Sequence, residues 1–232
     1  MEIGGTVISS VEYHGKISLV IFMAKCPLEC PYCHNSEILN GGREISLSEI
    51  YKIIDDSSEY IDAVVVSGGE PLVQIDDLIS ILKFSKKLKL KTKLDTSACY
   101  PDRLKKVLPY LDYLAIDIKA PYDKYKEIIG SDIGNQVAES IRISNSDSNI
   151  FLECRTTFVP MLLNNEDIKQ ISHEIKCDLY TIQQFRNKNV LDESLEDVKS
   201  PNPHELKKLA KEIKPNLNKV KITTSEFGEE YI

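Results

Sequence analysis

Two hydrophobic periodicities alternate along the chain. Short apolar runs rich in β-branched residues predict strands at residues 17–23, 63–66, 90–94, 113–118, 151–159 and 179–184. Between these runs, as at residues 75–82, apolar side chains recur three and four positions apart, which is the spacing of one helical face. The pattern therefore predicts repeated strand–helix units, which assemble into a parallel sheet.

Capping residues indicate where several helices begin. Ser46 and Glu49 have the spacing of a capping box, in which each side chain bonds the backbone of the other residue. Asn164 precedes a second apolar helical pattern, and Asn202 followed by Pro203 predicts the start of a third.

Residues 122–150 carry a weaker pattern. One or two helical pieces are expected there, interrupted by Gly130 and Gly134, with a polar turn at 144–149. A short closing strand is expected at 220–223.

Six strand–helix units are too few for a complete eight-stranded barrel, which needs about 250 residues. We therefore predict an α/β fold, a partial (β/α)6 TIM-like barrel with parallel strands. No change in composition divides the chain, so residues 1–232 are expected to form a single domain. Its barrel core would span about 16–190, and a C-terminal helix and short strand would occupy 191–232.

Composition and charge narrow the class of protein. The 232 residues are 42% hydrophobic and 28% charged, as in a soluble α/β protein. The net charge of −7 argues against a nucleic-acid partner. No apolar run approaches the ~20 residues that a membrane helix needs. Because the first residues also lack a secretory signal, we expect a cytoplasmic protein.

Three cysteines lie within one short stretch. Cys26, Cys30 and Cys33 have a C-x3-C-x2-C spacing directly after the first predicted strand. A [4Fe–4S] cluster normally takes four thiolates, so three from one loop would leave one iron open to another ligand. Zinc held by the three cysteines and His34 is an alternative, although no second C-x2-C pair is present. Three unrelated thiols are the other alternative.

The remaining cysteines are scattered. Cys99, Cys154 and Cys177 are interpreted as ordinary buried thiols, since free cysteine is among the most buried residue types. No further cysteine-rich insert follows the first loop, so one cluster is expected.

The cysteine motif, with aromatic Tyr32 before its third cysteine, resembles the signature of the radical S-adenosylmethionine (SAM) enzymes. The longer string at residues 30–35, Cys-Pro-Tyr-Cys-His-Asn, is similar to the activating enzymes of glycyl-radical enzymes. The resemblance implies that the open iron chelates SAM. Reductive cleavage of SAM would then give methionine and a 5′-deoxyadenosyl radical that abstracts hydrogen. A partial barrel is also the fold of that superfamily.

Polar residues follow the next predicted strands, where functional loops collect in βα folds. Ser67, Gly68, Gly69 and Glu70 end the second strand. By itself this stretch fits a simple turn as well as a binding site. After the cysteine motif it resembles the family's Gly-Gly-Glu motif, which implies that it receives the SAM amino group.

Two further strand ends carry acidic residues. Asp95 and Thr96 end the third strand, and Asp117 and Lys119 lie two positions apart at the fourth. Asp117 and Lys119 would share a face of the sheet, where they could also pair for structural reasons. The resemblance implies that Asp95, Thr96 and Asp117 bind a monovalent cation beside the SAM carboxylate. It places Lys119 near SAM or the substrate, as a catalytic residue.

The fifth and sixth strands supply further candidates. Arg155 resembles the arginine that contacts SAM, although a structural ion pair with Glu153 or another acid is an alternative. Gln183, Gln184 and Arg186 lie where activases of pyruvate formate-lyase have a histidine near SAM, and this segment looks closer to the activases of anaerobic ribonucleotide reductase. Ala98 and Cys99 depart from the pattern of that branch, which leaves the role of Cys99 open.

We call residues 24–42, which carry Cys26, Cys30 and Cys33, the cysteine loop. Two other residues of this loop are expected to influence the cluster. His34 would either pack the loop or adjust the cluster's potential through an indirect contact. Tyr32 would pack beside the cluster and help to exclude water.

The first hypothesis is therefore an activase that uses the cluster and SAM to take hydrogen from a glycine. Its partner would be a glycyl-radical enzyme, anaerobic ribonucleotide reductase, and its electron donor flavodoxin or ferredoxin. The second is a radical SAM enzyme that modifies a tRNA base, a deazapurine precursor or a peptide. The third is a non-catalytic iron–sulfur or zinc-binding protein.

Overall fold

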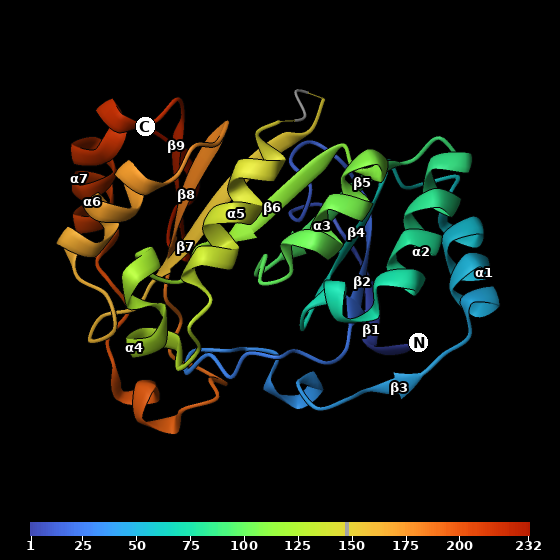
Figure 1. Ribbon diagram of the computed structural model, residues 1–232, viewed down its shortest axis with the longest axis horizontal. Helices are drawn as coiled ribbons and strands as arrows, with labels where there is room; N and C mark the ends of the chain where they lie inside the picture. The colour runs from blue at the N-terminus through green and yellow to red at the C-terminus, as the bar shows by residue number, and fades with distance from the viewer. Residues whose placement is uncertain (147–148) are drawn as a thin grey trace.

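A computed structural model describes residues 1–146 and 149–232 of the chain. Within those residues the strands form one ten-stranded sheet in the order β10-β9-β8-β7-β6-β5-β4-β2-β1-β3 (Figure 1). The strands are β1 (Glu2–Ser9), β2 (Ser18–Met23), β3 (Arg43–Glu44), β4 (Ala63–Gly68), β5 (Lys91–Thr96), β6 (Tyr113–Asp117), β7 (Phe151–Phe158), β8 (Leu179–Gln184), β9 (Val220–Thr224) and β10 (Gly228–Tyr231). Strands β2 and β4 to β9 pair in parallel, which confirms the predicted α/β architecture.

Helices connect the parallel strands and lie along one face of the curved sheet (Figure 1). They are α1 (Leu47–Ser57), α2 (Ile75–Lys87), α3 (Pro101–Val107), α4 (Tyr125–Ile129), α5 (Gly134–Ser144), α6 (Asn165–Glu174) and α7 (Pro203–Ile213). The main core fills the space between the two layers, with Ile81 of α2, Leu114 of β6 and Ile182 of β8 fully buried. Burial of such side chains is the main term that stabilises a sheet against its helices.

The predicted helix starts are confirmed. Ser46 accepts a hydrogen bond from the Glu49 backbone, and Asn164 forms a capping box with Asp167. Asn202 accepts from the backbone of His204, with Pro203 as the first helical residue. These side chains satisfy backbone donors that the first helical turn leaves without partners.

The weakly patterned region contains α4 and α5, as expected. Gly130 ends α4 in a left-handed conformation with φ of 78°, and Gly134 is the first residue of α5. The polar turn predicted at 144–149 begins one residue too early, because Ser144 still belongs to α5. Residues 147–148 of that predicted turn lie outside the described residues.

Three strands at the sheet's ends had no predicted counterpart. β1 pairs antiparallel with β2, β3 contributes two residues beside β1, and β10 pairs antiparallel with β9. Their sequences lack a continuous apolar run because these strands are largely exposed. The predicted strand at 220–223 is confirmed as β9, which adds a seventh parallel strand beside β8.

The carboxyl ends of the parallel strands meet at one edge of the sheet. In Figure 1 this edge faces downward, where the blue segment after β2 crosses toward the orange segment after β8. The backbone of Asp192 donates a hydrogen bond to the Pro31 carbonyl at 2.8 Å, so these two distant segments touch. In the described part of the chain, no helix has the length and apolar character required to cross a membrane.

Candidate active site

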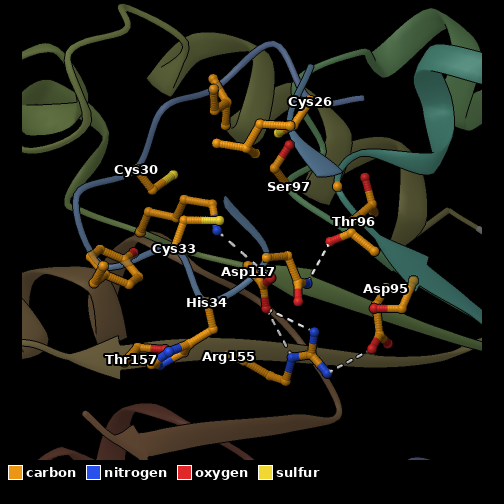
Figure 2. Close-up of a pocket in the computed structure, with 18 of the residues that line it drawn as sticks. Cys26, Cys30, Cys33, His34, Asp95, Thr96, Ser97, Asp117, Arg155 and Thr157 are labelled. Carbon is orange, nitrogen blue, oxygen red and sulfur yellow. Dashed lines mark hydrogen bonds and ion pairs between the residues drawn. The ribbon is translucent and has the colours of Figure 1, made fainter. Parts of the chain in front are cut away.

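A single pocket at this edge brings together most of the predicted site residues (Figure 2). The predicted site residues that line this pocket are Cys26, Cys30, Tyr32, Cys33, His34, Ser67, Gly68, Gly69, Asp95, Thr96, Asp117, Lys119 and Arg155. These residues come from the segment after β2, from the last residues of β4, β5 and β6 or the positions just after β4 and β6, and from β7 itself. Parallel strands make this convergence necessary, because every one of them ends at the same edge.

Two predicted residues do not line the pocket. Glu70 is fully buried between neighbouring loops. Gln184 is also buried, where its amide donates to the Pro201 carbonyl at 2.9 Å and accepts from the Ser225 backbone at 2.7 Å. Gln184 was expected at the cofactor because it ends a parallel strand, but strand position alone does not say which face a side chain occupies.

Sequence reasoning did not select six residues that line the pocket: Leu28, Asn35, Leu39, Ser97, Ile118 and Thr157. Three had a usable signal. Asn35 belongs to the cysteine-loop string, Ser97 follows Asp95 and Thr96, and Thr157 lies two positions after Arg155 on the same face of a strand.

The cysteine loop is fastened to the rest of the protein at both ends. The backbone of Lys25 donates to the Ile38 carbonyl at 2.8 Å, and that of Cys26 donates to the Leu39 carbonyl at 3.0 Å. Asn35 Nδ2 donates to the Gly68 carbonyl at 2.9 Å. These bonds close the cysteine loop at its base and hold it against the end of β4.

His34 faces the segment that follows β8. Its Nδ1–H donates to the carbonyl oxygen of Lys188 at 3.1 Å, while the ring itself is exposed. His34 therefore packs the loop against its neighbour. This contact also places an imidazole beside Cys33, where it would alter the electrostatic surroundings of a bound metal.

The thiols suit a cluster better than a single ion. Within residues 1–146 and 149–232, no three His, Cys, Asp or Glu side chains converge on a point that would hold one metal ion. A cubane binds each thiolate at a different iron, so its ligands lie apart. Burial raises the pKa of Cys26 to about 12 and also raises the pKa of Cys30. Metal binding must therefore displace the protons of both thiols.

The other three cysteines are buried and do not line the pocket. Burial raises the pKa of Cys99 to about 12, with the nearby Glu70 carboxylate adding to the effect. This placement agrees with the interpretation of these three cysteines as ordinary buried thiols.

Gly68 and Gly69 allow the chain to approach itself closely. A Cβ atom on Gly68, whose φ is +120°, would lie 2.3 Å from the Met23 carbonyl oxygen. A Cβ on Gly69 would lie 2.4 Å from the carbonyl oxygen of Lys25. Contacts under 3 Å exclude any side chain at either position. The paired glycines thus seat the β4 loop against the start of the cysteine loop.

Glu70 ties this loop to the one after β5. Its Oε1 accepts from the Leu72 backbone at 3.0 Å and from Thr96 Oγ1 at 2.7 Å. Its Oε2 accepts both the backbone and the hydroxyl of Ser97. Burial raises the pKa of Glu70, and these donors oppose that rise. Four hydrogen bonds occupy the acceptor sites of a carboxylate.

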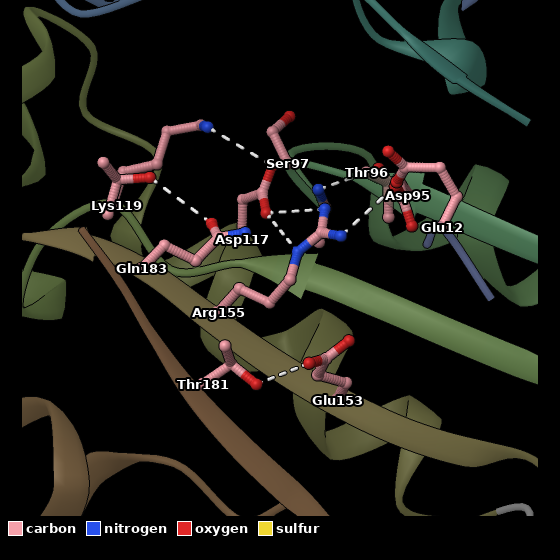
Figure 3. Close-up of polar contacts among 12 residues, drawn as sticks. Glu12, Asp95, Thr96, Ser97, Asp117, Lys119, Glu153, Arg155, Thr181 and Gln183 are labelled. Carbon is pink, nitrogen blue, oxygen red and sulfur yellow. Dashed lines mark hydrogen bonds and ion pairs between the residues drawn. The ribbon is translucent and has the colours of Figure 1, made fainter. Parts of the chain in front are cut away.

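Charged side chains alternate across the pocket floor (Figure 3). Arg155 donates through Nε to Asp117 Oδ1 at 2.9 Å and through Nη1 to Asp95 Oδ2 at 3.2 Å. Lys119 Nζ lies 3.7 Å from the other Asp117 oxygen. The ion pair foreseen for Arg155 is therefore with Asp95 and Asp117. The alternative partner, Glu153, instead accepts from Tyr113 and Thr181.

Burial and charge act in opposite directions on these groups. Burial favours a higher pKa for Asp117, but the Arg155 and Lys119 cations outweigh it and hold that pKa below its ordinary value. For Lys119, burial has the opposite effect and favours a lower pKa, but the surrounding acidic groups outweigh it and raise that pKa well above its ordinary value. All three side chains therefore remain charged at neutral pH.

One acceptor in the pocket is incompletely satisfied. Asp95 Oδ1 is buried and accepts no hydrogen bond from any described residue, although Lys93 Nζ lies 3.3 Å away as an ion-pair partner. Asp95 therefore lies between two cationic side chains, Lys93 at Oδ1 and Arg155 at Oδ2.

Comparison with known proteins shows the family to which the chain belongs. The family model of the radical SAM superfamily matches residues 20–175. A Methanocaldococcus jannaschii protein, named as a glycyl-radical enzyme activating enzyme, is 38% identical over 94% of this chain and 93% of its own. The pyruvate formate-lyase-activating enzyme of Clostridium pasteurianum is 30% identical over 85% of this chain and 90% of its own.

The fold is also shared with a solved structure. Streptococcus suis SuiB bound to S-adenosylmethionine superimposes with a TM-score of 0.68 at 15% identity, covering 86% of this chain and 48% of SuiB. The cofactors of such enzymes are a [4Fe–4S] cluster and SAM, and the thiols of the pocket fit the first of these. This chain is a radical SAM enzyme and belongs to the family of the glycyl-radical enzyme activating enzymes.

Proposed function

We propose that this protein activates a glycyl-radical enzyme by removing a Cα hydrogen atom from one glycine of its partner. The observation that carries the proposal is the similarity to named activating enzymes across nearly the whole chain. That similarity is joined to a pocket with three cysteine thiols at its wall. Reductive cleavage of SAM at the cluster supplies the 5′-deoxyadenosyl radical that such a reaction needs.

In this proposal Cys26, Cys30 and Cys33 hold the cluster. Arg155 binds the SAM carboxylate, since a guanidinium matches a carboxylate with two parallel hydrogen bonds. Lys119 lies near SAM and the partner's glycine, and Tyr32 covers the cluster. Lys119 Nζ is 6.0 Å from the Tyr32 ring centroid, which supports a shared position at the pocket wall.

The backbone carbonyls of Ser67 and Gly68 are proposed to accept hydrogen bonds from the ammonium group of SAM. Glu70 already has four donors, so this part of the motif would contribute through its backbone and through the loops that Glu70 holds. Asp95, Thr96 and Asp117 are proposed to bind a monovalent cation, and their common position in the lining of the pocket supports this.

The partner is proposed to be anaerobic ribonucleotide reductase, in the cytoplasm, with flavodoxin or ferredoxin as the electron donor. The Gln184–Phe185 segment at the end of β8, where no histidine occurs, supports that choice of partner. We also propose that residues 1–232 form one domain around the continuous sheet.

The test is electron paramagnetic resonance of the reduced, cluster-loaded protein mixed with SAM and its ribonucleotide reductase. A glycyl-radical doublet is expected, and Cys30→Ala should abolish it together with 5′-deoxyadenosine formation. Formation of 5′-deoxyadenosine without a doublet from a matched partner would contradict the activase proposal and favour another substrate.

A further inference from the structure

A buried lysine lies behind the floor of the active-site pocket. Lys93 belongs to β5, two positions before Asp95 and on the same face of the sheet, and its side chain is only 5% exposed. It is not among the residues that line the pocket. Lysine is rarely buried without a partner, because a desolvated ammonium group is costly. The contacts of Lys93 therefore indicate its role.

Three segments of the chain hold the Lys93 ammonium group in one place. Its Nζ lies 3.3 Å from Asp95 Oδ1 and donates a hydrogen bond to the backbone carbonyl of Glu12, in the turn between β1 and β2. It also lies 5.0 Å from the centre of the Tyr113 ring, at the start of β6. Tyr113 is fixed in turn, because its hydroxyl donates to Glu153 at 2.9 Å. Lys93 is thus an internal cation whose ion-pair partner is Asp95.

Lys93 is one end of a row of five alternating charges. Asp95 lies between Lys93 and Arg155, and Asp117 lies between Arg155 and Lys119 (Figure 3). The row begins and ends with a cation, so three positive charges face two carboxylates. The four members other than Lys93 all line the pocket. The row therefore presents one excess positive charge to a bound ligand.

The excess charge matters because Arg155 has two carboxylates as neighbours. If Arg155 alone had to neutralise Asp95 and Asp117, a third carboxylate entering the pocket would be repelled. Lys93 neutralises Asp95 from behind, and Lys119 does the same for Asp117. The arrangement leaves the charge of Arg155 for an incoming anion.

We propose that Lys93 is a positioning residue for SAM: by holding Asp95, it leaves the Arg155 guanidinium available to the SAM carboxylate. This inference rests on the proposed binding of that carboxylate by Arg155. Lys93 lies outside the pocket lining, so it acts through Asp95 and Arg155. A lysine that only stabilised the fold would not distinguish between ligands with and without a carboxylate.

The test compares SAM with decarboxylated SAM, which lacks only the carboxylate and keeps the sulfonium and the amino group. Anaerobic isothermal titration calorimetry measures both affinities on the cluster-loaded protein, without reductant or partner and at a fixed concentration of monovalent salt. Lys93→Met should weaken binding of SAM about tenfold and leave the affinity for decarboxylated SAM within about twofold. That retained affinity also shows that the variant is folded. Equal weakening of both ligands, or no weakening of either, would overturn the proposal.

Two further variants separate the charge of Lys93 from its packing. Lys93→Arg keeps a cation beside Asp95 and should bind SAM more tightly than Lys93→Met. Lys91→Met is the matched control, because Lys91 lies on the same strand and pairs with Asp112 at 2.9 Å, outside the pocket. It should leave both affinities within about twofold. A loss of SAM affinity in Lys91→Met equal to that in Lys93→Met, or no rescue by Lys93→Arg, would overturn the proposal.

The assay also separates this inference from the proposed function. It requires neither SAM cleavage nor a partner, so a missing glycyl-radical doublet leaves its outcome unaffected. Equal affinity of the wild type for SAM and decarboxylated SAM would overturn the proposed recognition of the carboxylate together with the role of Lys93. A wild-type preference for SAM that is fully retained in Lys93→Met would overturn the role of Lys93 alone.

Discussion

At the scale of single residues, the Gly-Gly-Glu stretch shows how one motif can combine two tasks. Gly68 and Gly69 let the β4 loop lie against Met23 and Lys25. Glu70 points away from the pocket and accepts four hydrogen bonds from three residues in two loops. The carboxylate thus positions the pocket wall from behind, and this role exists before SAM is bound.

Glu70→Gln is expected to destabilise the cluster-free protein by about 1–3 kcal/mol. Each carboxylate oxygen faces a backbone N–H, that of Leu72 or that of Ser97. Whichever way the glutamine amide is turned, its NH2 group must face one of these donors. The measurement is urea denaturation without SAM.

The matched control is Glu37→Gln, the same change at an exposed glutamate of the cysteine loop, which should leave stability nearly unchanged. Normal stability of Glu70→Gln combined with weakened SAM binding would contradict the positioning role. That result would identify Glu70 as a direct ligand.

At the scale of elements, the amino-terminal edge of the parallel strands is joined to a helix by a separate polar cluster. Asp112, just before β6, accepts from Lys86 of α2, from Lys91 Nζ at 2.9 Å and from the Thr92 backbone at 2.9 Å. Burial favours a higher pKa, but the two lysines and the backbone donor hold the Asp112 pKa at about 2. The carboxylate thus joins α2 to the starts of β5 and β6.

This lowered pKa predicts how stability depends on pH. The folded protein holds the Asp112 proton less tightly than the unfolded chain, whose aspartates titrate near 3.9. The stabilisation is therefore complete above about pH 4 and disappears as the pH falls toward 2. Asp112→Asn should cost about 2 kcal/mol at pH 7 and progressively less below pH 4.

Denaturant titrations of the cluster-free wild type and Asp112→Asn at pH 7, 4 and 3 would measure this difference. Asp56→Asn removes an exposed carboxylate on α1 and serves as the control. A stability difference for Asp112→Asn that stays constant across these pH values would exclude the proposed ionic origin.

At the scale of the whole molecule, the pocket occupies one edge of a sheet whose core lies elsewhere. The apolar layer between the sheet and helices α1 to α7 is built from side chains of every parallel strand. The cysteine loop adds Leu28, Cys30 and Tyr32 to this buried cluster, and Cys26 and Cys33 pack against it, but most of the cluster comes from the strands and helices. The fold is thus stabilised mainly by burial of apolar side chains that belong to the strands and helices rather than to the metal site.

We therefore expect the variant with Cys26, Cys30 and Cys33 all replaced by alanine to remain folded. Its far-UV circular dichroism should match the wild type, and unfolding should stay cooperative. Hydrogen exchange should increase mainly in residues 24–42, relative to the cluster-loaded protein. Hydrogen-exchange mass spectrometry measures both the size and the location of the change.

Leu114→Ala, which removes a fully buried side chain from β6, provides the contrast. It should lower global stability by about 2–5 kcal/mol and increase exchange throughout the sheet. Loss of cooperative unfolding in the triple-cysteine variant would mean that the cluster is required for folding.

By itself, the amino-acid sequence determined the parallel strands, the helix starts and the cysteine motif. These features depend on residues that are close together in the chain, namely periodic apolar runs, capping pairs and the spacing of Cys26, Cys30 and Cys33. It missed β1, β3 and β10, because exposed edge strands need no continuous apolar run.

Only the tertiary structure decided what each strand-end side chain contacts. It turned Glu70 inward to Thr96 and Ser97, placed Arg155 between two aspartates and buried Gln184 away from the pocket. The partners of these side chains are up to 60 residues away in sequence, so no local pattern records them. Long-range pairing of polar groups follows from how the strands are ordered and which face each side chain takes, and both are properties of the folded sheet.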